Sequence, residues 1–531
     1  MNYKQYQHRI EKAAIACLLI VIVGISYLTE CRGQNTDPVL QYTVSMPEPS
    51  DHLFHIVLDC KNLKKDTVDL KMPQWMPGYY QIMNYSRLVR NFTAINLEGR
   101  ETTVERINNN TWRIIPGKNN SLRISYDVYS DRKFVASNYL DSTRGYIVPA
   151  ATFMFINEHT DIPVIIKVVP FNSWNNIATG LAAIEGKSGE FIAPDFDILY
   201  DCPILVGKLE ELPSFNISGI KHRFIAYNPG IFNRTEFITA LEKTVKAGID
   251  LFGEIPYKEY TFIGIGPGAG GIEHLNNTTV SFSGMGLDKP GAMERIMKFL
   301  AHEYFHHYNV KRIRPFELGP FDYDKENRTN LLWFSEGVTV YYEYLIVRRA
   351  GLITDEELIK SIESEINTFE NDPGRRYQSL SQASYNTWSD GPFGNRPGEE
   401  DKLISYYNKG CLAGMILDFA IRNATGNKKS LDDVMRLLYE EYYKKLQRGF
   451  TDAELQDACE EVAGISLSPE FEYVYTTKDI EYSKYLSYAG LKITEDKDTS
   501  TGRRKFTITR QDNLNSLQLS IFQSWSGGSG I

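Results

Sequence analysis

The chain has 531 residues, which is long enough for two or three domains. Charged residues make up 24% of it and hydrophobic residues 42%, a balance that allows large cores and excludes a globally disordered chain. The formal net charge is −9 and no basic run occurs, so we expect no nucleic-acid partner.

The N-terminus has the pattern of a secretory signal peptide. Basic residues precede an uncharged apolar run at 13–28, and small residues follow it. The run is short for a membrane-spanning helix, which needs about 20 apolar residues. We therefore assign residues 1–33 as the signal peptide of a secreted or periplasmic protein, with no membrane span after cleavage. The alternatives are an uncleaved membrane anchor and a lipidated Cys31.

Residues 34–223 have the pattern of a mostly antiparallel β domain. Apolar and polar residues alternate over 41–46, 55–59 and 122–129, and turn residues separate these runs. Such alternation is typical of strands with one buried face. The 33 tyrosines of the chain suit a β-rich part of this kind.

A second region, residues 224–490, begins with mixed patterns and then becomes helical. Helical spacing over 232–252 is followed at 260–266 by an apolar run that indicates a buried strand. The next stretch, 267–276, is rich in glycine. No Gly-Lys-Ser/Thr follows it, so it is not a phosphate-binding loop.

The motif His302-Glu303-x-x-His306 lies late in an amphipathic helix that begins after the turn at 288–291. Positions i and i+4 share one helix face, so the two histidines can bind a single metal ion. Neutral imidazole is a good ligand for Zn²⁺, and a catalytic zinc uses about three protein ligands. Glu303 lies where a general base for the attacking water belongs. The expected cofactor is therefore Zn²⁺.

Glu336 is the natural third ligand. It lies in the segment 333–337, directly before a helical pattern at 338–349, so its carboxylate can face the histidine pair from a second helix. A glutamate at a helix N-terminus also favours the helix dipole, and for Glu336 alone this explanation is equally good. The histidine pair upstream makes the ligand interpretation the better one.

Helical patterns continue to the end of the second region. A polar stretch at 371–401 is predicted to be a long loop, and loops of that length in compact domains often serve function, here as a cover of the cleft. Helical patterns at 406–422, 431–443 and 453–462 follow it.

Several of these segments resemble the glycyl aminopeptidase family of zinc metallopeptidases. The resemblance is carried by 302–315, 333–342, 74–80, 139–146 and 201–207. That family belongs to the gluzincins, and its wider relatives include aminopeptidase N. The fold implied is α+β and multidomain: an N-terminal, mostly antiparallel β domain followed by a thermolysin-like, largely helical zinc-peptidase domain.

The resemblance implies further site residues. In this family and in aminopeptidase N, a strand beside the zinc pairs with the substrate backbone, and its glutamate binds the substrate's α-ammonium. Gly271, Ile272 and Glu273 match that strand. Tyr407 matches the tyrosine that stabilises the oxyanion in aminopeptidase N-like enzymes, and Tyr406 is its rival if the register differs by one residue. The ordinary alternatives are a solvated loop glutamate and a core tyrosine.

The function implied is a secreted zinc metalloaminopeptidase that hydrolyses N-terminal residues, with glycine or alanine preferred, from peptides with a free N-terminus. The alternatives are a zinc metalloendopeptidase, which needs an open cleft and no ammonium clamp, and a periplasmic peptide-binding protein with little activity. Family members usually continue into a PDZ-type domain. Residues 491–531 are too short for a complete one, so we expect a tail with that domain incomplete or absent. No pattern predicts an oligomeric state.

Overall fold

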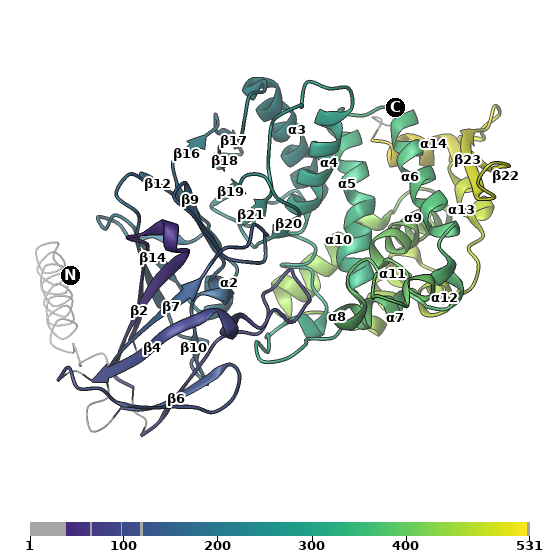
Figure 1. Cartoon of the computed structure of the whole chain (residues 1–531). Coiled ribbons are helices and arrows are strands. Elements are labelled where there is room, and N and C mark those ends of the chain that lie inside the picture. The colour runs from purple at the N-terminus through teal and green to yellow at the C-terminus, as the bar shows by residue number, and fades with distance from the viewer. Residues whose placement is uncertain (1–38, 64–65, 97, 117–120, 528–531) are drawn as a thin grey trace, which may run out of the picture.

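The computed structural model describes residues 39–63, 66–96, 98–116 and 121–527. The predicted signal peptide lies outside these residues. Figure 1 shows the β-rich part on the left and the helices on the right, with the chain running from one to the other. The predicted α+β fold, with a β part first and a largely helical part second, is confirmed. No helix in the described part of the chain is long and apolar enough to span a membrane.

A large sheet of alternately buried strands forms the first layer of the β part. Its order is β13-β14-β11-β1-β2-β7-β4, and β1 and β11 are its parallel pair. Along β2, every second side chain is buried, as the sequence alternation predicts. The strands are β1 (Val39–Ser45), β2 (Leu53–Lys61), β4 (Val89–Asn96), β7 (Leu122–Tyr129), β11 (Val164–Val169), β13 (Ala182–Ala183) and β14 (Glu190–Ala193).

Two smaller antiparallel sheets complete the β part. The first has the order β10-β3-β6-β5 and the second β12-β15-β9-β8, with the short helix α2 (Phe196–Tyr200) before β15. Their strands are β3 (Val68–Lys71), β5 (Thr103–Arg106), β6 (Thr111–Ile115), β10 (Phe155–Ile156), β8 (Tyr139–Leu140), β9 (Arg144–Ile147), β12 (Asn176–Thr179) and β15 (Ile204–Gly207).

A fourth sheet, of order β16-β18-β19-β21-β20, carries the glycine-rich stretch to the helices. Its strands are β16 (Leu209–Glu211), β17 (Phe215–Ile217), β18 (Ile220–Tyr227), β19 (Glu259–Gly264), β20 (Gly271–Glu273) and β21 (Asn277–Val280). The predicted domain boundary at 223/224 falls inside β18, because Arg223 and Phe224 both pair with β19. We place the boundary before β16 instead. Alternation marks a strand but not the sheet that it joins.

The helices that follow pack around one hydrophobic core. Five of the longer helices are α3 (Arg234–Phe252), α4 (Ala292–Phe305), α5 (Val338–Arg349), α6 (Asp355–Glu370) and α9 (Tyr406–Ala424). Thr354 and Glu357 form a capping box at the start of α6. The remaining helices are α7 (Leu380–Tyr385), α8 (Thr387–Asp390), α10 (Leu431–Leu438), α11 (Asp452–Ala463), α12 (Ser468–Tyr475), α13 (Tyr482–Tyr488) and α14 (Ser516–Trp525).

The stretch predicted as a loop at 371–401 contains α7 and α8, so that prediction was wrong in part. These helices are too short for their periodicity to be visible, and buried residues such as Leu380 and Trp388 hold them in place. The C-terminal stretch also folds against the helices. The hairpin β22 (Leu491–Lys497) and β23 (Arg504–Arg510) bonds to side chains of α6, and Trp525 of α14 donates to the Tyr341 hydroxyl of α5.

Candidate metal centre and active site

Helix α4 carries the His-Glu-x-x-His motif because one of its faces is apolar. Met297, Leu300 and Tyr304 are buried in the helical core, and Gly291 at positive φ begins the helix. The helix ends at Phe305, so His302 and Glu303 occupy its last turn and His306 caps it. Packing of the apolar face therefore fixes which way the motif points.

The structure brings the three predicted metal ligands together. His302 Nε2 lies 2.9 Å from His306 Nε2 and 3.6 Å from a carboxylate oxygen of Glu336, and His306 Nε2 lies 3.1 Å from the same oxygen. In the described part of the chain, this is the group of histidine, cysteine and acidic side chains close enough to hold a metal ion. The His306 and Glu336 side chains are almost fully buried, and the His302 side chain is 11% exposed.

Each histidine is oriented by its other ring nitrogen. His302 Nδ1 lies 2.9 Å from the Glu343 carboxylate, and His306 Nδ1 lies 2.7 Å from the carbonyl oxygen of Asn309. Both partners are acceptors, so both Nδ1 atoms carry hydrogen and both Nε2 atoms present lone pairs. Glu343 was not predicted from the sequence. It lies seven residues after Glu336, about two helical turns along α5, and that spacing was the available signal.

These residues fit a tetrahedral Zn²⁺. Ligand bonds of about 2.0–2.2 Å place tetrahedral ligand atoms about 3.3–3.6 Å apart, close to the separations seen here. Two imidazole lone pairs and a carboxylate that face one another repel unless a cation lies between them. Burial opposes protonation of His302, but the Glu336 and Glu343 carboxylates raise its pKa well above the usual value. The pocket therefore stabilises positive charge.

Glu336 lies on a π-helical turn, Trp333–Gly337, rather than at an ordinary helix start. π-Helical turns are rare in proteins, and those that do occur are often found at functional sites. The Asn309 side-chain amide donates to the Phe334 carbonyl oxygen at 2.9 Å and to the Thr339 hydroxyl at 3.1 Å. Asn309 thus ties the residues after α4 to the turn that presents Glu336, while its own carbonyl orients His306.

Two glycines allow α9 to approach this turn. A Cβ added at Gly337 would lie 2.5 Å from the Cα of Gly410, and one added at Gly410 would lie 2.6 Å from the Trp333 carbonyl oxygen. The backbones therefore touch where the predicted metal ligand Glu336 and the start of α9 meet. This contact explains why residue 337, directly after Glu336, is glycine. It also explains why residue 410, three residues after Tyr407, is glycine.

Tyr407 faces the metal centre and Tyr406 does not. Tyr407 lines a cavity of about 700 Å³ together with His302 and Glu303, and its ring centroid lies 6.1 Å from that of His302. Tyr406 is buried in the helical core, and its hydroxyl lies 3.2 Å from the Thr387 hydroxyl. The register predicted for the oxyanion donor is therefore the one that reaches the cavity.

Glu303 lies against β20. The residue is 5% exposed, and a Cβ added at Gly271 would lie 2.4 Å from its Oε1. Its Oε2 has no hydrogen-bond partner among the described residues. Burial raises the pKa of Glu303 to about 7 against the opposing fields of His302 and His306. A carboxyl with that pKa exchanges a proton readily near neutral pH, as a general base must.

Glu273 is buried at the other end of β20. It is 4% exposed, and Oε1 lies 3.7 Å from the Lys311 ammonium, which also bonds to Asp201 at 2.8 Å. Burial opposes the charge, but Asp201 and Glu273 hold the pKa of Lys311 above its usual value. Neither Lys311 nor Asp201 was predicted as a site residue, because 110 residues separate them. Their meeting depends on how the two parts of the chain pack.

Gly271 and Ile272 differ in what they offer a ligand. Gly271 is half-buried and lines the 700 Å³ cavity with Glu303. The Ile272 side chain is buried in the core of the β part, so its backbone alone can serve a ligand. Glu273 does not line this cavity. It is covered by a segment of the β part, where a Cβ added at Gly78 would lie 2.9 Å from its Oε2.

Comparison with known protein families accounts for both halves of the chain. A model of the Peptidase M61 N-terminal domain matches residues 41–208, and a model of the M61 glycyl aminopeptidase matches residues 295–413. The chain belongs to the M61 glycyl aminopeptidase family. The second match includes His302, His306 and Glu336, so the candidate metal centre lies in the peptidase part. The first match ends one residue before β16, which agrees with the domain boundary placed there.

Solved structures extend this comparison to the fold. An aminopeptidase N family protein from Idiomarina loihiensis is 26% identical, with a TM-score of 0.80 over 86% of this M61 chain and 80% of that one. An M1 zinc metallopeptidase from Deinococcus radiodurans shares the fold at 13% identity, with a TM-score of 0.51 over 83% and 94% of the two chains. No curated protein sequence matches significantly. This chain therefore belongs to a peptidase family, and its fold resembles that of an aminopeptidase N family protein.

Proposed function

We propose that the chain is a zinc-dependent aminopeptidase that removes N-terminal glycine or alanine from peptides. The observation that carries the proposal is the convergence of the His302 Nε2, His306 Nε2 and Glu336 carboxylate atoms within 4.8 Å of one another. Glu303 lies beside them, next to the edge strand β20. A metal centre, a base and a peptide-binding edge in one cavity are the parts that peptide hydrolysis requires.

The proposed mechanism gives each side chain one task. When bound, Zn²⁺ supplies Lewis-acid polarisation of the scissile carbonyl. Glu303 takes the proton of the attacking water and later delivers it to the leaving amine. The Tyr407 hydroxyl donates a hydrogen bond as negative charge develops on the carbonyl oxygen. The backbone of Gly271 and Ile272 pairs with the substrate and holds the scissile bond beside Glu303.

Glu273 is proposed to bind the substrate's α-ammonium and so to place the first peptide bond at the metal centre. A buried carboxylate forms a strong pair with an ammonium. The cover over Glu273 leaves little room, since a Cβ added at Gly78 would lie 2.7 Å from Ile272 and 2.9 Å from Glu273. Tight cover beside the ammonium supports a preference for small N-terminal residues. A D. radiodurans relative was crystallised with a Tyr-Ser-Ala substrate, which fits a peptide substrate class.

One observation favours a metalloendopeptidase as the second candidate. Lys311 already lies 3.7 Å from Glu273 and is held by Asp201, so Glu273 has a resident cation even without substrate. If Lys311 satisfies Glu273 fully, the carboxylate has no need of an α-ammonium. The two candidates then differ in one property: whether the enzyme needs a free amine at the substrate's end.

The test compares free and blocked substrates. We expect Gly- and Ala-aminoacyl chromogens to be cleaved faster than the Leu compound, and N-acetylated peptides scarcely at all. Glu273→Ala should reduce kcat/KM for free-amine substrates by about 30-fold or more, since a buried charge pair is lost. Internal cleavage of acetylated peptides at the rate of free substrates would instead establish the endopeptidase. Absence of any peptidase activity in the zinc-loaded protein would leave only peptide binding.

We further propose that the mature protein is secreted or periplasmic. The support is the signal-peptide pattern over residues 1–33, with basic residues before an apolar run. N-terminal sequencing of the protein from its native host should begin close to residue 34. A mature chain that begins at Met1 and fractionates with membranes would favour the uncleaved anchor instead.

A further inference from the structure

We propose that the cleft beyond the metal centre binds a carboxylate of the leaving peptide through Arg295. The ligand is a peptide whose carboxylate, from either its C-terminus or an acidic side chain, lies two or three residues after the scissile bond. This inference rests on the proposed function, because it needs the substrate's N-terminus at Glu273. It adds a recognition element for the far end of short substrates.

The 700 Å³ cavity lies on the leaving side of the scissile bond. It is lined by Gly270 and Gly271 of the edge strand and by Glu303, but not by Glu273. A peptide held by its ammonium at Glu273 and paired with β20 runs from Glu273 toward Gly271. The residues after the scissile bond therefore enter this cavity.

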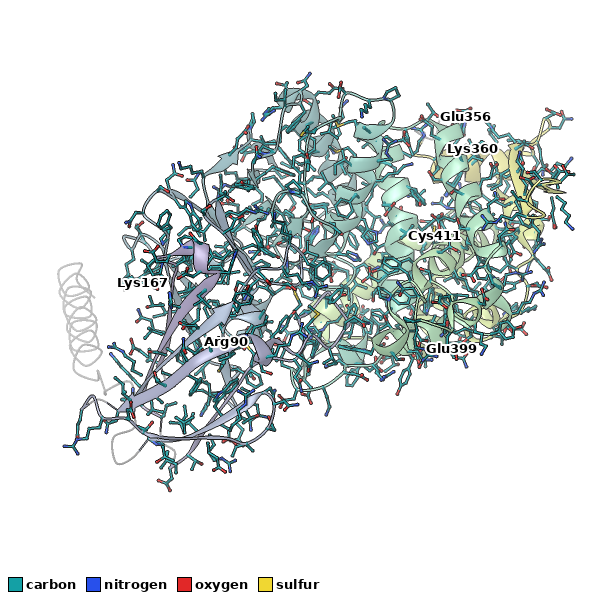
Figure 2. All side chains as sticks on the ribbon, in the orientation of Figure 1. Arg90, Lys167, Glu356, Lys360, Glu399 and Cys411 are labelled. Atoms are coloured by element: carbon teal, nitrogen blue, oxygen red, sulfur yellow. The ribbon has the colours of Figure 1, made fainter. Side chains whose placement is uncertain are left out.

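The cavity continues along α4 away from the metal centre. Its lining includes Val340 and Tyr344 of α5, Arg295 of α4 and Lys360 of α6. Figure 2 shows Lys360 near the upper end of α6. Arg295 precedes His302 by seven residues, which is about 10 Å of helix. An extended peptide covers that distance in about three residues.

Most charges that line the cavity are already paired. Lys298 bonds to Glu294 at 2.8 Å and to the Ser361 hydroxyl at 3.1 Å, so its ammonium is fixed and compensated. The Lys360 ammonium lies 2.7 Å from Glu363. The charges of these two lysines are therefore already compensated by neighbouring glutamates.

The acidic groups of the wall are also engaged. Glu343 bonds to His302, and Glu357 closes the capping box of α6 by accepting from the Thr354 amide. Arg295 is exposed and has no ion pair or side-chain hydrogen bond within the described ranges. Among the cations that line the cavity, the Arg295 guanidinium is therefore the one without an ion-pair partner in the described ranges, and its planar fork matches a carboxylate.

The test measures how much a carboxylate improves cleavage. Gly-Ala-Ala-Ala with a free C-terminus should be cleaved with a kcat/KM about tenfold above its C-terminal amide, the range of one charge-assisted hydrogen bond at a partly exposed site. In Arg295→Ala the two peptides should be cleaved equally well, through a rise in KM for the free acid. Arg295→Lys should keep part of the preference for the free acid, and Arg295→Glu should prefer the amide. Arg376→Ala, which removes an exposed arginine outside the cavity, serves as the matched control.

A second peptide pair identifies the source of the carboxylate. Gly-Ala-Glu-Ala-amide and its Gln analogue differ only in an acidic side chain. If Arg295→Ala loses only the preference for Glu over Gln, the site binds acidic side chains. If it loses the preference for the free acid over the amide, the site binds the C-terminal carboxylate. If wild type prefers neither carboxylate, or if Arg295→Ala keeps both ratios, the inference is wrong. Hydrolysis of Gly-p-nitroanilide by wild type tests the proposed function separately.

Discussion

Replacing Glu303 with glutamine tests the proposed base with little structural change. The residue is 5% exposed and its side chain lies against Gly271, so an amide of equal size fits the same space. The replacement breaks no hydrogen bond of Oε2, which has no partner among the described residues. Burial already raises the pKa of Glu303 to about 7, so the loss of its charge costs little. Glutamine cannot accept the proton of water. We expect kcat to fall by about 10²–10⁴, or about 3–5 kcal/mol of barrier.

The assay pairs turnover with metal content. Release of p-nitroaniline from the Gly compound gives kcat, and atomic absorption gives zinc per chain for wild type and Glu303→Gln. The variant should keep one zinc, because Glu303 is not among the three converging ligand groups. The free energy of unfolding should change by no more than about 0.5 kcal/mol, because the replacement leaves the packing intact. Near wild-type turnover with one zinc bound would refute the assignment of the base.

Three further predictions concern the neighbours of the metal centre. Glu343→Ala should weaken zinc affinity by about 10–100-fold in chelator competition, because it orients His302; unchanged affinity would contradict that role. Tyr407→Phe should lower kcat by about 10²–10³, whereas Tyr406→Phe should mainly change the unfolding temperature; the reverse pattern would show that the register is wrong. The kcat/KM profile should fall on the acid side as Glu303, with its pKa raised to about 7 by burial, becomes protonated. Bound zinc favours the ionised carboxylate and so moves the acid limb of the profile to lower pH. A profile that is flat down to about pH 4 would contradict the assignment of Glu303 as the base.

Local periodicity explains what the sequence could predict. The apolar spacing before His302 predicts an amphipathic helix with the histidines in its last turns, and α4 has that form. The helix predicted at 338–349 matches α5, and the capping box of α6 follows from Thr354 and Glu357. These features depend on residues within one or two turns of each other, which is the range over which sequence patterns carry information.

The missed features depend on contacts between distant segments. The π-helical turn at Glu336 is stabilised by Asn309 and by the close approach of Gly410, and neither leaves a local pattern. The pair of Lys311 with Asp201 joins the peptidase part to the β part. The same holds for the boundary inside β18, where pairing with β19 decides sheet membership. Tertiary packing, not propensity, determined each of these outcomes.

The most direct test of the account is removal and return of the metal while N-terminal glycine release is measured. A chelator should abolish release of glycine from Gly-Ala-Ala-Ala, and one equivalent of Zn²⁺ should restore it. His306→Ala and Glu336→Ala should not recover under the same treatment, because each removes one of three converging ligand atoms. Glycine release that persists in the metal-free protein, or that returns equally in the ligand variants, would contradict the central claim.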